Sequence, residues 1–426
     1  MKDFEKHVIS DGINYICVPA TRFKTNESSV SFALPMDEKT ASRNALLIRL
    51  LSSCSKDYPD MMTRNKKLAM LYGASLRSSA VKQGDTQVLS LMFSALDDRF
   101  SIDGEKISLE GLKLLFSLAF NPRLDENGDF YDDDIEREKR ILIQKLESEN
   151  NDKRSYALKR LEEEMFRGEA FSCNVWGEKE RVKNITKAEL KEAYGDFLEK
   201  AKIQLVTVGD ADEEKSLELF KTSLPEVKRN YEKIKKAKFI PSAKESKTVE
   251  ERQEIKQGKL VLGFRVNARD GSDKTDAVRV FTDIFGGGPY SKLFMNVREK
   301  LSLCYYCSAR YYRRNNCIII QCGCEEENMD KAVNEILRQN ENIQNGDFES
   351  EYNSSIIALC DSVKSVYDDS LVLLSWYMSQ ICDDEILSPS RVIEDYKNVT
   401  FDEVKNASSL LSLDTVFKLM SQKEEK

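Results

Sequence analysis

The side chains best suited to chemistry lie in the second half of this 426-residue chain. Three consecutive glycines, Gly286, Gly287 and Gly288, are followed by Arg298 and then by Tyr305. Glycine lets a backbone approach a ligand closely. A guanidinium and a phenol can both hold a peptide carbonyl or carboxylate. This stretch is therefore suited to gripping a peptide, and its pattern predicts a glycine-rich loop, a helical turn and then a strand.

The order of these residues resembles a signature in the C-terminal half of the pitrilysin/insulinase-like zinc metallopeptidases, a family that includes mitochondrial processing peptidase. The resemblance runs through Ser291-Lys-Leu-Phe294, Arg298-Glu-Lys300 and Leu303-Cys-Tyr305. In that family the arginine and tyrosine help hold a substrate peptide over zinc. The resemblance implies that Arg298, Tyr305 and the three glycines bind an extended peptide. In the alternative interpretation Arg298 forms a surface ion pair with Glu299, and Tyr305 is a core residue of a strand.

The family's zinc site is missing its ligands here. Family enzymes bind zinc through H-x-x-E-H and a distant glutamate, whereas this chain has one histidine, His7. The resemblance places Ala45 and Arg49 in the histidine slots, Ile48 in the glutamate slot and Lys145 in the third-ligand slot. Cations repel a divalent metal, and isoleucine cannot act as a general base. We therefore expect no metal in these slots and no catalysis by the chain alone, as in inactive bacterial relatives.

The chain has ten cysteines, and five of them fall between residues 304 and 324. A metal site formed by Cys304, Cys307, Cys322 and Cys324 is one interpretation. On a strand, residues three apart face opposite ways, so we expect Cys304 and Cys307 to diverge. We favour small buried hydrophobes instead, and we predict no cofactor. A cysteine nucleophile is a further alternative, for which His7 would have to be the base.

Bulk properties exclude several classes of protein. The net charge of -8 argues against nucleic-acid binding, which requires a basic surface. We find no apolar run of membrane-spanning length and no secretion signal at the start. We therefore expect a cytoplasmic protein with no membrane or nucleic-acid partner.

An internal repeat indicates two copies of one α+β unit. Lys183–Ala193 matches Lys397–Ala407, and both segments contain a threonine followed three residues later by an acid, which is a capping-box pattern. A β-branched segment follows each copy. A weaker echo lies upstream, where Asp85–Phe93 follows a hairpin-like turn as Cys317–Cys322 does.

The repeat and the composition predict the architecture. We expect two homologous lobes, each a mostly antiparallel sheet layered with helices: an N-terminal lobe (residues 1–222), a charged exposed linker (223–258) and a C-terminal lobe (259–426). In the first lobe, Val30–Leu34 predicts an edge strand and Thr40–Leu51 a buried helix.

Taken together, these patterns predict a non-catalytic, peptide-binding subunit of a cytoplasmic peptidase. Its expected partners are a zinc-bearing homologous subunit and a peptide or unfolded polypeptide. One alternative is a structural or assembly protein with the same fold and no peptide binding, like inactive relatives in respiratory complexes. The other alternative is an enzyme with unrelated cysteine or metal chemistry.

Overall fold

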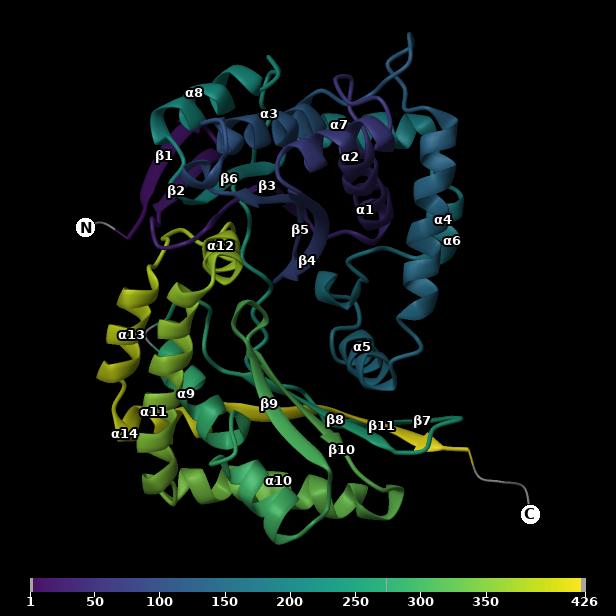
Figure 1. Ribbon diagram of the computed structural model, residues 1–426. Helices are drawn as coiled ribbons and strands as arrows, with labels where there is room; N and C mark the ends of the chain where they lie inside the picture. The colour runs from purple at the N-terminus through teal and green to yellow at the C-terminus, as the bar shows by residue number, and fades with distance from the viewer. Residues whose placement is uncertain (1–2, 273, 423–426) are drawn as a thin grey trace. The chain divides into compact units, whose positions relative to one another are not determined.

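The computed structural model describes residues 3–272 and 274–422 (Figure 1). Packing divides the chain into two compact units, and each is discontinuous in sequence. Unit 1 contains the residues up to Glu147, together with Cys173–Lys235 and Ser365–Ser388. Unit 2 contains Ser148–Ser172, Lys236–Lys364 and the residues from Pro389 onward. Each unit has one sheet layered with helices, so the predicted α+β class is confirmed.

The sheet of unit 1 has six strands in the order β1-β2-β6-β3-β5-β4. Neighbouring strands are antiparallel except β2 and β6, which are parallel. The strands are β1 (Glu5–Ser10), β2 (Ile13–Pro19), β3 (Thr25–Pro35), β4 (Ser75–Gln83), β5 (Thr86–Leu96) and β6 (Lys202–Gly209). Val30–Leu34 lies in β3, between β6 and β5, so its prediction as an edge strand is wrong. Its residues are buried on both faces of the sheet, which is the burial expected of a central strand.

Helices cover both faces of this sheet. Alternate residues of β2 point to opposite faces: Tyr15 joins the main core, whereas Ile16 packs with Leu373 and Leu374. The helices assigned to this part of the chain are α1 (Glu38–Ser53), α2 (Met61–Met70), α3 (Ile107–Phe120), α4 (Asp132–Ser148), α6 (Lys179–Lys183), α7 (Lys187–Glu199), α8 (Glu213–Ser223) and α12 (Ser370–Met378). The helix predicted at Thr40–Leu51 is α1, and most of it is buried.

The sheet of unit 2 has five strands in the order β7-β11-β8-β10-β9. Its neighbours are antiparallel except β7 and β11, which are parallel. The strands are β7 (Lys247–Gln253), β8 (Lys259–Val266), β9 (Tyr306–Tyr312), β10 (Cys317–Gly323) and β11 (Leu411–Ser421). The helices are α5 (Lys153–Met165), α9 (Thr275–Gly286), α10 (Met329–Gln344), α11 (Glu349–Lys364), α13 (Pro389–Asn398) and α14 (Phe401–Ser408).

Each unit recruits one helix from the other half of the sequence. Helix α5 precedes the predicted linker, but it packs on β8 and β11 through Leu161 and Met165 (Figure 1). Helix α12 comes from the second half and packs on β3 and β6. The lobe boundaries at residues 222 and 258 were predicted from the sequence repeat. The compact units are defined by packing and are discontinuous in sequence, so they do not test these boundaries.

The repeated segments form equivalent elements. Thr186 and Thr400 both cap helices with complete capping boxes, and β6 and β11 follow those helices. The predicted charged linker contains one ordered element, the edge strand β7, whose residues alternate between exposed and partly buried. A strand with charges on its solvent face is compatible with this composition, although the sequence did not lead us to expect one.

Candidate functional site

Arg298 and Tyr305 lie at the two ends of an unusual turn in unit 2. Phe294–Lys300 forms a wide π-helical turn, η3, and such turns are rare and frequently functional. Ser302 then takes a left-handed conformation with φ 49°, which is uncommon outside glycine. Backbone hydrogen bonds fix the turn: Leu303 N donates to Val297 O (3.0 Å) and Tyr305 N donates to Gly323 O (2.8 Å).

This turn encloses a hollow of about 390 Å³. Its lining residues come from η3, from the turn before β9 and from the segment after β10: Arg298, Glu299, Ser302, Leu303, Cys304, Tyr305, Glu325 and Asn328. The structure therefore brings the predicted Arg298 and Tyr305 together at one surface.

The hollow is lined by one cation, Arg298, and by two carboxylates, Glu299 and Glu325. Arg298 Nε lies 3.5 Å from Glu299 Oε1, and the guanidinium lies 4.6 Å from the ring centre of Phe294. The Tyr305 hydroxyl donates to Glu325 (3.0 Å), and this bond raises the pKa of Tyr305 because it favours the protonated phenol. Tyr305 is 59% exposed, so it is not the core residue of the alternative interpretation. The Arg298–Glu299 ion pair of that interpretation is present but long, which leaves the guanidinium able to bind a carbonyl or carboxylate.

The three glycines lie in close contact with neighbouring residues of unit 2. They are not among the residues that line the hollow. Gly286 ends α9, and a Cβ there would lie 2.6 Å from the backbone nitrogen of Ala309 in β9. A Cβ on Gly287 would meet the Asp283 side chain, and one on Gly288 would meet the Tyr290 ring. Gly286 therefore lets α9 pack closely on β9. Gly287 and Gly288 leave room for the side chains of Asp283 and Tyr290. Peptide binding by them stays a prediction.

A half-buried carboxyl group holds this loop in place. Asp283 of α9 accepts hydrogen bonds from the Tyr290 hydroxyl and from Ser355 (2.6 Å). Burial raises the pKa of Asp283. The sequence reasoning missed this network, because Ser355 lies on α11 and nothing local connects it to the loop.

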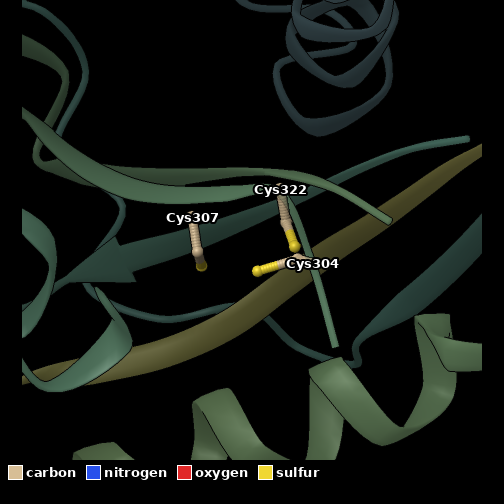
Figure 2. Close-up of side chains that lie close together, drawn as sticks. All are labelled: Cys304, Cys307 and Cys322. Atoms are coloured by element: carbon tan, nitrogen blue, oxygen red, sulfur yellow. The ribbon is translucent and has the colours of Figure 1, made fainter. Parts of the chain in front are cut away.

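Three cysteines converge beside the hollow. The sulfur atoms of Cys304, Cys307 and Cys322 all lie within 4.8 Å of one another (Figure 2). The prediction that Cys304 and Cys307 face opposite ways is wrong, because β9 begins at Tyr306 and Cys304 belongs to the turn before it. The pKa of Cys304 is lowered, because its sulfur accepts hydrogen bonds from the thiols of Cys307 and Cys322 and because the charge of Arg298 favours the thiolate.

A sequence signal could have revealed two of these cysteines. Tyr312 pairs with Cys317 across the β9–β10 hairpin. Counting five residues back along β9 and five forward along β10 leads to Cys307 and Cys322, which pair directly. The turn at residues 313–316 was recognised from the sequence, so this pair was within reach.

In unit 1, the predicted zinc-ligand slots hold a structural arrangement. Ala45 and Ile48 are fully buried in the core. Arg49 forms an ion pair with the buried Glu138 (2.9 Å). Lys145 lies over the Trp176 ring, 4.7 Å from its centre. These contacts assign Arg49 and Lys145 separate partners and give no support to a shared position at one metal site.

His7 binds a carboxylate in unit 1. Its Nε2 lies 2.6 Å from Glu213 Oε1, and its ring stacks on Tyr15. Cys17 belongs to the neighbouring strand, and burial above all raises the pKa of its thiol to about 11. A neutral thiol is a poor nucleophile, so this part of the structure gives the cysteine-enzyme alternative no support.

Comparisons with known proteins agree with this architecture. Residues 184–357 match the family model described as the peptidase M16 inactive domain. A Bacillus subtilis (strain 168) protein named probable inactive metalloprotease YmfF is 28% identical over 95% of both chains. The structure of a conserved protein from Enterococcus faecalis V583 is similar with a TM-score of 0.88 and 27% identity, over 100% of both chains. A peptidase M16 inactive domain from Pseudomonas fluorescens also covers 100% of both chains, with a TM-score of 0.78 and 17% identity.

These matches confirm the resemblance to the pitrilysin/insulinase-like metallopeptidases, and both the matched family model and the Bacillus subtilis relative are described as inactive. Within the described residues, no helix combines the length and the apolar composition needed to span a bilayer.

Proposed function

We propose that this chain is a non-catalytic, peptide-binding subunit. It has the fold of the peptidase M16 family, and the slots predicted for that family's zinc ligands hold other residues. It binds an extended peptide or unfolded polypeptide, and it acts in the cytoplasm with a homologous chain that bears zinc. Two observations support the non-catalytic part: the sequence contains one histidine, and both the matched family model and the Bacillus subtilis relative are described as inactive.

One observation carries the binding part of the proposal. Arg298 and Tyr305 line one hollow on a turn whose backbone is fixed at both ends. Both side chains are substantially exposed, at 41% for Arg298 and 59% for Tyr305. The guanidinium of Arg298 lies on a fixed turn, and its ion pair with Glu299 is long, at 3.5 Å. It can therefore donate hydrogen bonds to a peptide carbonyl or a terminal carboxylate.

The sheet beside the hollow supports an extended ligand. β9 is the last strand in the order of its sheet, and Tyr305 directly precedes it. Extended peptides bind other proteins by adding a strand to such an edge. A peptide paired along β9 would bring one of its ends to Tyr305 and Arg298.

The test compares Arg298→Ala with wild type in binding a fluorescently labelled, carboxymethylated unfolded polypeptide. A charge-assisted hydrogen bond contributes about 1.5–3 kcal/mol, so we expect binding to weaken by roughly tenfold or more. Arg167→Ala is the matched control, since Arg167 is an exposed arginine of the same unit that pairs with Glu164. Both variants should unfold like wild type, because both side chains lie at the surface.

Equal binding by the two variants would remove Arg298 from the site. No binding by wild type would contradict peptide binding and favour the structural or assembly alternative. The partner is tested separately, by isolating the chain from its native cell and identifying what accompanies it. We expect a homologous chain with H-x-x-E-H, and an assembly without any such chain would contradict the proposal.

A further inference from the structure

Three thiols from separate positions share one small volume in unit 2. Cys307 on β9 and Cys322 on β10 are a directly opposed cross-strand pair. Cys304 reaches them from the turn that precedes β9. Figure 2 shows the three side chains with their sulfur atoms gathered on one side of the β9–β10 ribbon, and each sulfur lies within 4.8 Å of the other two.

The backbone holds this arrangement without help from a ligand. Opposed residues of an antiparallel pair keep their Cβ atoms about 4.5–5.5 Å apart. The position of Cys304 is set by the left-handed Ser302 and by the bonds from Leu303 N to Val297 O and from Tyr305 N to Gly323 O. The three sulfurs are therefore preorganised, so little ordering is required when a ligand binds.

The surroundings differ across the cluster. Cys322 is fully buried, and Cys307 and Cys304 are 7% and 8% exposed. Cys304 also lines the hollow, and Arg298 lines the same hollow. The cluster thus has three buried thiols, one of which borders a hollow that also contains a cation.

These features match what a thiophilic metal ion requires. Zinc–sulfur bonds of about 2.3 Å at tetrahedral angles put sulfurs about 3.8 Å apart. Contraction from separations of at most 4.8 Å needs an ångström or less. Three thiolates and one Zn²⁺ leave one net negative charge, which the guanidinium of Arg298 offsets.

We propose that Cys304, Cys307 and Cys322 bind one Zn²⁺ ion, with the fourth position open to the hollow. Each thiol loses its proton to solvent when it coordinates, so no oxidant or reductant takes part. This site differs from the family's zinc slots, which lie in unit 1 and hold Ala45, Ile48, Arg49 and Lys145. It also goes beyond the peptide-binding proposal, because the Arg298→Ala binding test does not depend on metal.

The test titrates the reduced, metal-free full chain with Co²⁺ and then displaces Co²⁺ with Zn²⁺. We expect one equivalent of Co²⁺ with sulfur-to-cobalt charge-transfer absorption that disappears as zinc enters. Cys304→Ser and Cys307→Ser should lose this absorption. Cys360→Ser should keep it, since Cys360 is a buried cysteine of the same unit outside the cluster. Absorption that is absent from folded wild type, or that persists in both cluster variants, would overturn the proposal.

A second measurement uses wild type alone, so a misfolded variant cannot affect it. Zinc should slow alkylation of Cys304, which lines the hollow, as read by mass spectrometry of its peptide, while Cys173 and Cys382 should react as before. Equal alkylation of Cys304 with and without zinc would refute the site. Cobalt that binds without sulfur absorption would also refute the thiolate site. It would point instead to a second group of potential ligands in unit 1, formed by Glu5, His7 and Glu213.

Discussion

At the scale of a residue, Arg49 is part of a network of ion pairs in unit 1. Its guanidinium binds Glu138, which also contacts Arg137 Nε at 3.3 Å. Arg137 in turn binds Asp134 at 2.7 Å. Each of these buried carboxylates forms ion pairs with arginines, so removing one arginine would leave a buried charge without compensation.

Replacing Arg49 with methionine should therefore destabilise the protein by about 1–3 kcal/mol. Chemical denaturation measures this change. In the double variant with Glu138→Gln the loss should be smaller than the sum of the two single losses, because the residues are in contact. Lys183→Met is the control: Lys183 and Glu180 form an exposed ion pair, so this change should cost less than about 0.5 kcal/mol. Additive losses would show that Arg49 is not coupled to Glu138.

At the scale of elements, the junction of α9 with β9 positions the proposed binding turn. The helix ends at Gly286, where the backbone of Ala309 comes too close for a side chain. The loop then passes Tyr290 and leads into η3, so the placement of Arg298 depends on this contact.

Gly286→Ala should destabilise the protein by about 1–3 kcal/mol, since a methyl group forces the backbone of α9 and β9 apart. Gly195→Ala is the matched control, because Gly195 lies within α7 and its added Cβ would meet no atom within 4 Å outside the adjoining helix backbone. That change should stabilise the protein by about 0.5–1 kcal/mol through helix propensity alone. Thermal unfolding of both variants measures the difference. Two changes of the same sign would contradict the packing role of Gly286.

The same scale shows which elements the sequence could predict. The capping boxes at Thr186 and Thr400 and the β9–β10 hairpin were predictable, because their signals lie within a few residues. Strand β7 was not, since its sequence is charged and its partner β11 lies far along the chain. The exchange of α5 and α12 was also not predictable, because apolar periodicity says that a helix is buried but not against which sheet.

For the site, Arg298 and Tyr305 line one hollow, while their role in binding peptide stays a prediction; the expected direction of Cys304 was wrong. A strand pattern fixed the expected direction of Cys304, whereas the left-handed Ser302 turns the chain before the strand begins. Positive φ at a serine has no strong sequence signal, and no glycine marks the turn.

At the scale of the whole molecule, the chain has a peptidase-like fold of two units, and the residues predicted for the ligand slots make contacts within unit 1. The sheet of each unit is covered in part by a helix from the other half of the sequence. A fold of this kind does not by itself imply catalysis. We propose that hydrolysis, where it occurs, belongs to a zinc-bearing partner, and that this chain contributes binding.

The most direct test incubates a labelled unfolded polypeptide with the purified chain, both metal-free and loaded with zinc, and then adds the zinc-bearing homologue that we expect to accompany it in its native cell. The account predicts no cleavage by the chain alone in either form. It predicts cleavage once the partner is present, and weaker cleavage when the chain carries Arg298→Ala. Chelator-sensitive cleavage by the isolated chain, free of any partner, would contradict the account.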